Sequence, residues 1–234
     1  VRGLQLIPIA LIAALYSEMS YLKNKSKEKL INTFQHAAYS LFMVGAPIAI
    51  GLSVLASDFL ILVYGVKFLG SALPLQILSI SLIPIFFNYL IGSLLNASDK
   101  QTTNTVIKGI SVSSHILMCF ILIPLYDVVG AAVVGLMSNT LLFALGTYFA
   151  IKVLKRELKV FLPDLARIAV ASILMGTCVF FLKTYIHILV IIPIGMIIYI
   201  MSLIVIEKLT LESGIRSKAL KSFEDFYNIF LVKN

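Results

Sequence analysis

Long apolar stretches recur along the chain, and short polar or basic segments separate them. A helix needs ~20 mostly apolar residues to cross the hydrocarbon core of a bilayer. Seven stretches have about that length, at residues 4–21, 34–56, 72–97, 106–125, 128–151, 165–182 and 186–206. The pattern predicts an all-α, polytopic membrane protein in which residues 1–206 form one transmembrane domain of about seven helices.

One of these stretches is apolar but not uniformly so. Residues 68–98 contain no charged side chain, yet small and polar residues recur within them at spacings of three and four. On a helix such residues share one face. The stripe consists of Ser81, Pro84, Asn88, Gly92 and Asn96. Because hydrocarbon cannot satisfy amides and hydroxyls, we expect this face to meet protein or a water-filled cavity.

Three shorter segments complete the predicted organisation. The lysine-rich segment 23–29 is expected to be a solvated loop. Ser57 and Asp58 have the chemistry of a helix N-cap, and the apolar segment that follows is too short to cross a bilayer, so it predicts an interfacial helix ending at Gly65. Residues 207–234 are charged with apolar residues at helical spacing, which predicts an amphipathic tail on the membrane surface.

Composition and charge agree with the membrane interpretation. The chain is 60% hydrophobic and 13% charged, with a mean hydropathy of +1.02. Its net charge of +8 comes from basic clusters between apolar stretches, a pattern that argues against nucleic-acid binding. If the connections alternate between two sides, only Arg2, Lys67 and Lys183 of the 19 basic residues fall on one side. By the positive-inside rule the crowded side, including the C-terminus, is cytoplasmic, and we expect a multi-pass protein of the plasma membrane.

The later spans add further polar candidates. Lys108, Ser111 and His115 lie at helical spacing in the fourth span, and Asn139 lies in the fifth. Asn139, like the asparagines of the third span, is suited either to line a polar path or to hold helices together through hydrogen bonds. His115 is suited either to proton coupling and headgroup contact or to a neutral hydrogen bond with a neighbouring helix.

Two charged residues near span ends have similarly open roles. Lys108 lies about one turn from a predicted cytoplasmic connection, so it can contact a lipid phosphate or extend its ammonium group to the surface. Glu18 can carry coupling protons or form an interfacial ion pair with the lysine-rich segment.

The chain begins at Val1 with an apolar stretch close behind, so we expect it to be part of a longer polypeptide.

Four motifs, in this order and spacing, resemble one family of transporters. They are Leu6-Ile7-Pro8 followed by LYSEMS, LVYGVKF at 62–68, LLNASDK at 94–100 and ILIPLYDVVGAAVVGLMSN at 121–139. Together they resemble the C-terminal half of the polysaccharide-export flippases of the MATE-like, or MOP, superfamily. Asp127 departs from the family pattern, which more often has Gly at this turn.

The resemblance implies a function for the candidate residues. Members of this superfamily have about twelve or fourteen helices in two lobes, and they move lipid-linked oligosaccharides or polysaccharide repeat units to the outer leaflet by alternating access. The implied partners are a polyprenyl- or dolichyl-phosphate-linked sugar, membrane lipids and an N-terminal lobe of the same polypeptide. Asn88, Asn96 and Asn139 would then line the sugar path, Lys108 would meet the phosphate, and His115 or Glu18 would carry coupling protons.

Other functions fit the same pattern less well. A multidrug or cation antiporter of the MATE type would also show polar faces on its helices. A membrane glycosyltransferase or ligase needs paired acids or a histidine with a nearby carboxylate, whereas the eleven acidic residues of this chain are scattered. No catalytic residue, metal site or cofactor is therefore expected, although a purely structural membrane scaffold stays an alternative.

Overall fold

The computed structural model describes residues 2–154 and 162–211, and it confirms the predicted all-α membrane class. Every regular element within these residues is a helix. Six of the described helices are long and apolar enough to cross a membrane. The tail predicted for 207–234 falls mainly outside the described residues, since the last helix is described to Leu211.

The first two helices meet with almost no loop between them. A short 3-10 helix (η1, Arg2–Gln5) leads into α1 (Leu6–Lys25), and α2 (Lys27–Val54) begins one residue later. The solvated loop predicted for 23–29 is therefore wrong. The Ser26 hydroxyl accepts a hydrogen bond from the Lys29 amide at 3.4 Å, which caps α2, and lysine is a good helix former.

The third predicted span, 72–97, is divided into two helices, and a short α-helix and a 3-10 helix precede it. The short helix α3 (Ala56–Tyr64) follows α2, then come η2 (Val66–Ser71), α4 (Ala72–Ile80) and α5 (Leu82–Ala97). Asp58 lies in the first turn of α3 with Leu55 at the cap position, so the predicted Ser57-Asp58 cap is wrong. A carboxylate in the first turn is still favourable, because the unpaired amides there make this end of a helix positive, although Asp58 makes no capping hydrogen bond within the described residues.

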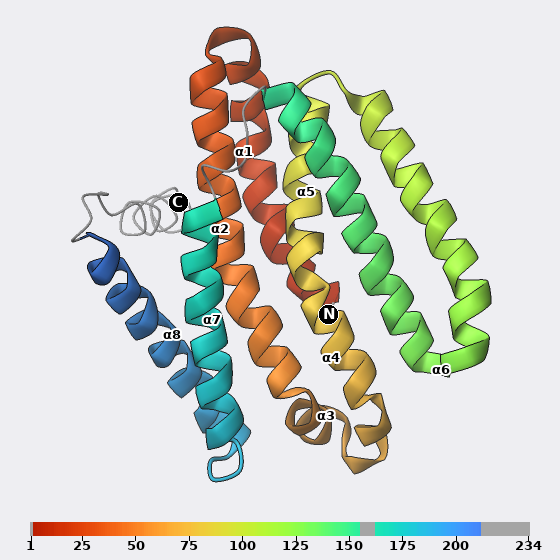
Figure 1. Cartoon of the computed structure of the whole chain (residues 1–234), viewed down its shortest axis with the longest axis vertical. Helices are drawn as coiled ribbons and strands as arrows, with labels where there is room; N and C mark the ends of the chain where they lie inside the picture. Colours follow the sequence, from red (N-terminus) through yellow and green to blue (C-terminus); the bar gives the residue numbers. More distant parts are fainter. Residues whose placement is uncertain (1, 155–161, 212–234) are drawn as a thin grey trace.

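The fourth and fifth predicted spans lie in one folded element, α6 (Gln101–Leu154). The backbone leaves the helical conformation at Asp127, with φ 47° and ψ −127°. This conformation is more easily adopted by glycine. The bend divides α6 into two arms, 101–126 and 128–154, which run back alongside each other as a hairpin (Figure 1).

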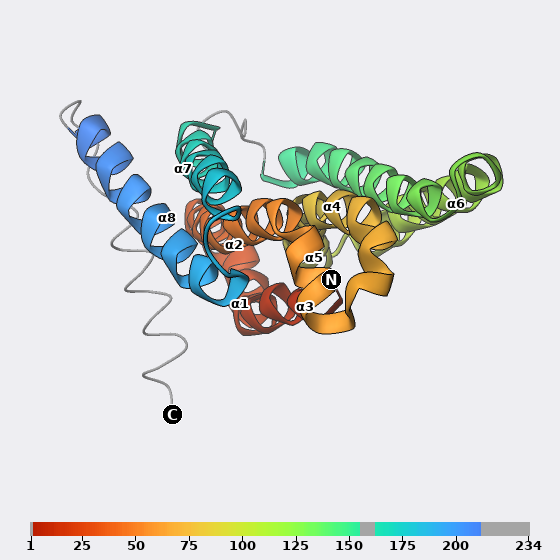
Figure 2. The same cartoon turned by 90° about the horizontal axis from the view of Figure 1, so that it is seen from below.

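The helices assemble around α5. This helix packs against α1, α2 and α6, and its buried side chains join those of α1 and α2 in the larger apolar core. The last two helices, α7 (Leu162–Leu182) and α8 (Ile188–Leu211), pack on each other, and α7 packs on α2 around a second, smaller core. Seen from below, α8 and the first arm of α6 lie at opposite edges (Figure 2).

The connections between helices gather at two ends. The lysine-rich junction of α1 and α2 lies at the same end as the turn between α5 and α6 (Figure 1). There the Lys23 ammonium and the Asp99 carboxylate form an ion pair across the two turns. The opposite end holds α3, the bend at Asp127 and the turn between α7 and α8. Lys183 lies in this last turn, at the end that the charge pattern predicts to be outside.

Candidate functional site: a polar seam between α5 and α6

A row of polar side chains joins α5 to both arms of α6 along the membrane-spanning part of the fold. We call this row the polar seam. Its members are Asn88 and Asn96 from α5, Asn104, Ser111 and His115 from the first arm of α6, and Ser138 and Asn139 from the second arm. The stripe predicted on residues 81–96 thus faces protein, because α5 packs against α6 along it.

At one end of the seam, Asn104 ties α6 to α5. Its amide nitrogen Nδ2 donates to Asn96 Oδ1 at 2.8 Å and to the Gly92 carbonyl at 3.4 Å. The Asn104 side chain is buried, whereas Asn96 is half-buried. The Asn104 amide lies close to the Gly92 backbone, since a Cβ built there would be in ordinary van der Waals contact with it, at 3.6 Å.

Farther along the seam, Asn88 reaches the second arm of α6. Its Nδ2 donates to the Asn139 carbonyl at 3.1 Å, and Asn139 Nδ2 in turn donates to the Gly135 carbonyl at 2.7 Å. Within the described residues, neither side-chain oxygen of these two asparagines accepts a hydrogen bond. Both side chains are half-buried, so these oxygens are acceptors that a bound polar group can use.

His115 and Ser111 connect the two arms of α6 through Ser138. Ser111 Oγ donates to the Ser138 carbonyl at 2.8 Å, and His115 Nδ1 lies 2.9 Å from Ser138 Oγ. Ser138 Oγ donates its single hydrogen to the Gly135 carbonyl at 3.2 Å, so it accepts from His115. The network therefore assigns the hydrogen of a neutral imidazole to Nδ1, and Nε2 is left as an acceptor on this half-buried ring.

The other two predicted site residues lie outside the seam. Lys108 is exposed on the first arm of α6, one turn before the buried Ser111. Glu18 is also exposed, and it accepts a hydrogen bond from the Thr33 hydroxyl of α2 at 3.3 Å. Glu18 is therefore part of the contact between α1 and α2, and the structure does not bring it to His115.

Sequence reasoning missed two members of the seam. Asn104 and Ser138 make most of its hydrogen bonds, but neither was a candidate. For Asn104 a usable signal was present, because Asn104, Ser111 and His115 share one helical face at spacings of seven and four. Ser138 gave no such signal, since its importance comes from the residues that the hairpin brings opposite it.

Comparisons with known proteins support the membrane class. A stretch of 119 residues is 26% identical to an uncharacterized membrane protein of Methanocaldococcus jannaschii. The match covers 51% of this chain and 23% of that relative, so the chain spans well under half of the relative's length. No family model matches the chain, and no solved structure matches it. The apolar helices and this relative together define an all-α, multi-pass membrane protein.

The buried end of the seam offers a stability test. Replacing Asn104 with Leu removes two hydrogen bonds and leaves Asn96 Oδ1 without its donor. We expect a loss of about 1–2 kcal/mol in the free energy of unfolding, measured by detergent-induced unfolding of the purified chain. Asn32→Leu is the matched control, because Asn32 is exposed on α2 and should change stability by less than about 0.5 kcal/mol. Equal effects of the two variants would contradict a structural role for this bond.

Proposed function

We propose that this chain forms one lobe of a transporter that flips lipid-linked oligosaccharides or polysaccharide repeat units to the outer leaflet. The observation that carries the proposal is the polar seam, a set of amide, hydroxyl and imidazole groups that are hydrogen-bonded between membrane-spanning helices. The four sequence motifs that resemble polysaccharide-export flippases support it. Each motif falls within the described residues, on α1, α3 to η2, α5 or α6.

The chemistry of the seam suits a neutral, hydroxylated cargo. A sugar crossing hydrocarbon loses its hydration, and each lost hydrogen bond costs several kcal/mol unless protein groups replace it. The oxygens of Asn88 and Asn139 and Nε2 of His115 are acceptors that sugar hydroxyls can use. Half-burial leaves part of each of these side chains accessible.

The charge of the seam favours sugar over a cationic drug. None of its seven members is an acid, and a pathway for organic cations needs carboxylates to offset the desolvated positive charge. Lys108 adds positive charge on the exposed side of the same helix arm. In this proposal Lys108 meets the phosphate of a polyprenyl or dolichyl carrier, and a second lobe of the same polypeptide closes the path.

A flipping assay tests the proposal. The full polypeptide that carries this chain and its second lobe is reconstituted in vesicles containing a fluorescent polyprenyl-diphosphate oligosaccharide, and transfer between leaflets is followed by quenching from outside. His115→Phe removes the imidazole acceptor while keeping an aromatic ring. We expect it to slow flipping about tenfold, as loss of one hydrogen bond to the cargo would.

The control for this assay is another helical histidine. His36 is exposed on α2 and lies outside the seam, so His36→Phe should leave the flipping rate unchanged. Vesicles with the unaltered full polypeptide that flip the probe no faster than protein-free vesicles would refute the transport proposal. Equal rates for the two histidine variants would instead remove His115 from the path.

A further inference from the structure

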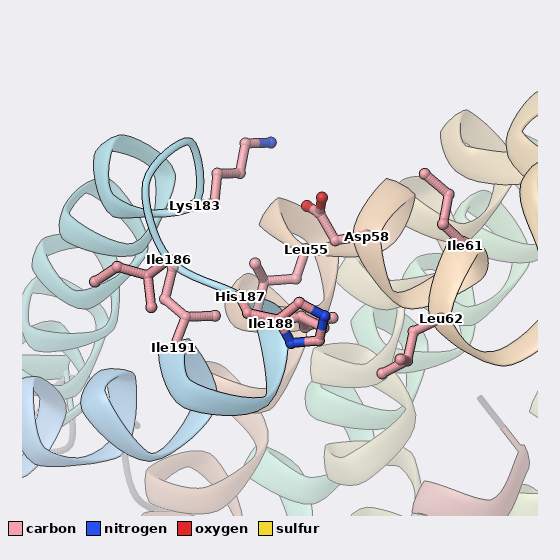
Figure 3. Close-up of a pocket in the computed structure, with 9 residues that line it drawn as sticks. All are labelled: Leu55, Asp58, Ile61, Leu62, Lys183, Ile186, His187, Ile188 and Ile191. Carbon is pink, nitrogen blue, oxygen red and sulfur yellow. The ribbon is translucent and has the colours of Figure 1, made fainter.

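A second polar site lies at the far end of the fold, away from the seam. A hollow of about 480 Å³ opens between α3 and the turn that joins α7 to α8. Its volume is within the ~300–1,000 Å³ of typical ligand pockets. Its walls are mostly Leu and Ile, and three titratable side chains enter it, Asp58 from α3 and Lys183 and His187 from the turn (Figure 3).

Asp58 offers an unused acceptor in this hollow. Its oxygen Oδ2 is buried and, among the described residues, has no hydrogen-bond partner. Leaving a charged acceptor without a donor costs at least ~1–3 kcal/mol. Ion pairing to Lys183 does not remove this cost, because the structure places no ion pair between these two described residues. A ligand with N–H donors would satisfy the carboxylate.

Lys183 and His187 supply the opposite chemistry. The Lys183 ammonium donates to the Val54 carbonyl at 3.2 Å, which leaves donor capacity in a group with three hydrogens. The Leu189 amide donates to His187 Nδ1 at 3.4 Å, so a neutral His187 ring carries its hydrogen on Nε2. The hollow thus presents one acceptor that suits an ammonium group and two donors that suit a phosphate.

The surroundings indicate that such a ligand arrives from the membrane. Tyr64, the last residue of α3, and Tyr185, in the turn between α7 and α8, are 59% and 87% exposed, and aromatic residues of this kind anchor at the headgroup level. The pocket wall continues onto the exposed side chains of Ile61 and Leu62. These apolar residues can carry the start of an acyl chain beside a bound headgroup.

We propose that this hollow binds the headgroup of a phospholipid that carries a primary amine, of the phosphatidylethanolamine class. The lipid ammonium meets Asp58, and the lipid phosphate meets Lys183 and His187. The zwitterionic headgroup leaves no net charge uncompensated in a site that holds one acid and one ammonium group. This inference is independent of the cargo that the polar seam accepts.

Lipid binding to the purified chain in detergent tests the proposal by native mass spectrometry. The probes are phosphatidylethanolamine, phosphatidylcholine, which lacks N–H donors, and phosphatidylglycerol, which lacks the amine. We expect phosphatidylethanolamine to bind about tenfold more tightly than either of the others. Asp58→Asn should abolish this preference without weakening phosphatidylglycerol binding, while Lys183→Gln should weaken all three lipids.

The matched control is Asp99→Asn, which neutralises an exposed acid in the turn between α5 and α6. That turn lies at the end of the fold opposite the turn between α7 and α8 (Figure 1). The control variant should leave the lipid preference intact. The thermal unfolding midpoint of each variant identifies any variant that fails to fold, and Asp58→Glu then replaces Asp58→Asn as the test of acceptor position. Three results would each overturn the proposal. They are equal binding of the three lipids, an unchanged preference in Asp58→Asn, and displacement of bound phosphatidylethanolamine by soluble phosphoethanolamine as effectively as by the lipid itself.

Discussion

Replacing Gly130 with Ala should open the hairpin of α6 and cost about 2–3 kcal/mol in the free energy of unfolding. A Cβ built at Gly130 would overlap the Leu122 carbonyl group on the opposite arm and lie 3.2 Å from the Ile123 nitrogen. These are backbone atoms, so no change of side-chain rotamer can relieve the overlap. Detergent-induced unfolding followed by circular dichroism measures the loss.

The control for this substitution lies on the same helix. A Cβ at Gly109 would meet no atom within 4 Å, so Gly109→Ala tests the change in helix propensity alone. Alanine is favoured over glycine in a helix interior by up to about 1 kcal/mol, so this control should be neutral or stabilising. A Gly130→Ala variant as stable as the Gly109→Ala variant would contradict the close approach of the two arms.

The spans were predictable because they depend on the length of apolar stretches. Charge density then misled the prediction at 23–29, where lysines suggested a loop but helices continue on both sides of Ser26. Lysine is a good helix former and is favourable near a helix C-terminus, so only Ser26, whose hydroxyl caps α2, marks the junction. The turn at Asp127 was predicted from the sequence. Its backbone conformation was not, because the positive φ there is one that glycine adopts more easily than aspartate.

The faces of single helices were also predictable, but the partners of those faces were not. Helical spacing placed Asn88 and Asn96 on one side of α5, and both do make contacts toward α6. Periodicity carries no information about which residue lies opposite, so Ser138 was missed. The hollow at Asp58 was missed for the same reason, since Lys183 is far from it in sequence and only packing of α7 on α2 brings them together.

The largest loss from a single side chain is expected at Phe86. This residue is 1% exposed and lies in the larger core, where α5 packs on α2. Truncation to alanine leaves a cavity the size of a ring, and we expect Phe86→Ala to cost about 3–5 kcal/mol in the free energy of unfolding. Phe120→Ala is the control, because Phe120 is 77% exposed on α6 and should cost less than about 1 kcal/mol.

A second experiment tests whether the specific contact between Phe86 and Gly45, and not only the volume of the Phe86 ring, holds α5 against α2. The Phe86 ring lies against Gly45 of α2, where a Cβ would come within 2.8 Å of the ring carbon Cδ2. Gly45→Ala alone should therefore destabilise the chain, and the smaller Phe86→Leu side chain should make room for the added methyl group. We expect the double variant to be at least about 0.5 kcal/mol more stable than the sum of the single effects predicts. Additive effects would mean that helix α2 can shift away from α5 at this contact, and the packing of the two helices would then not depend on the pairing of glycine with an aromatic ring.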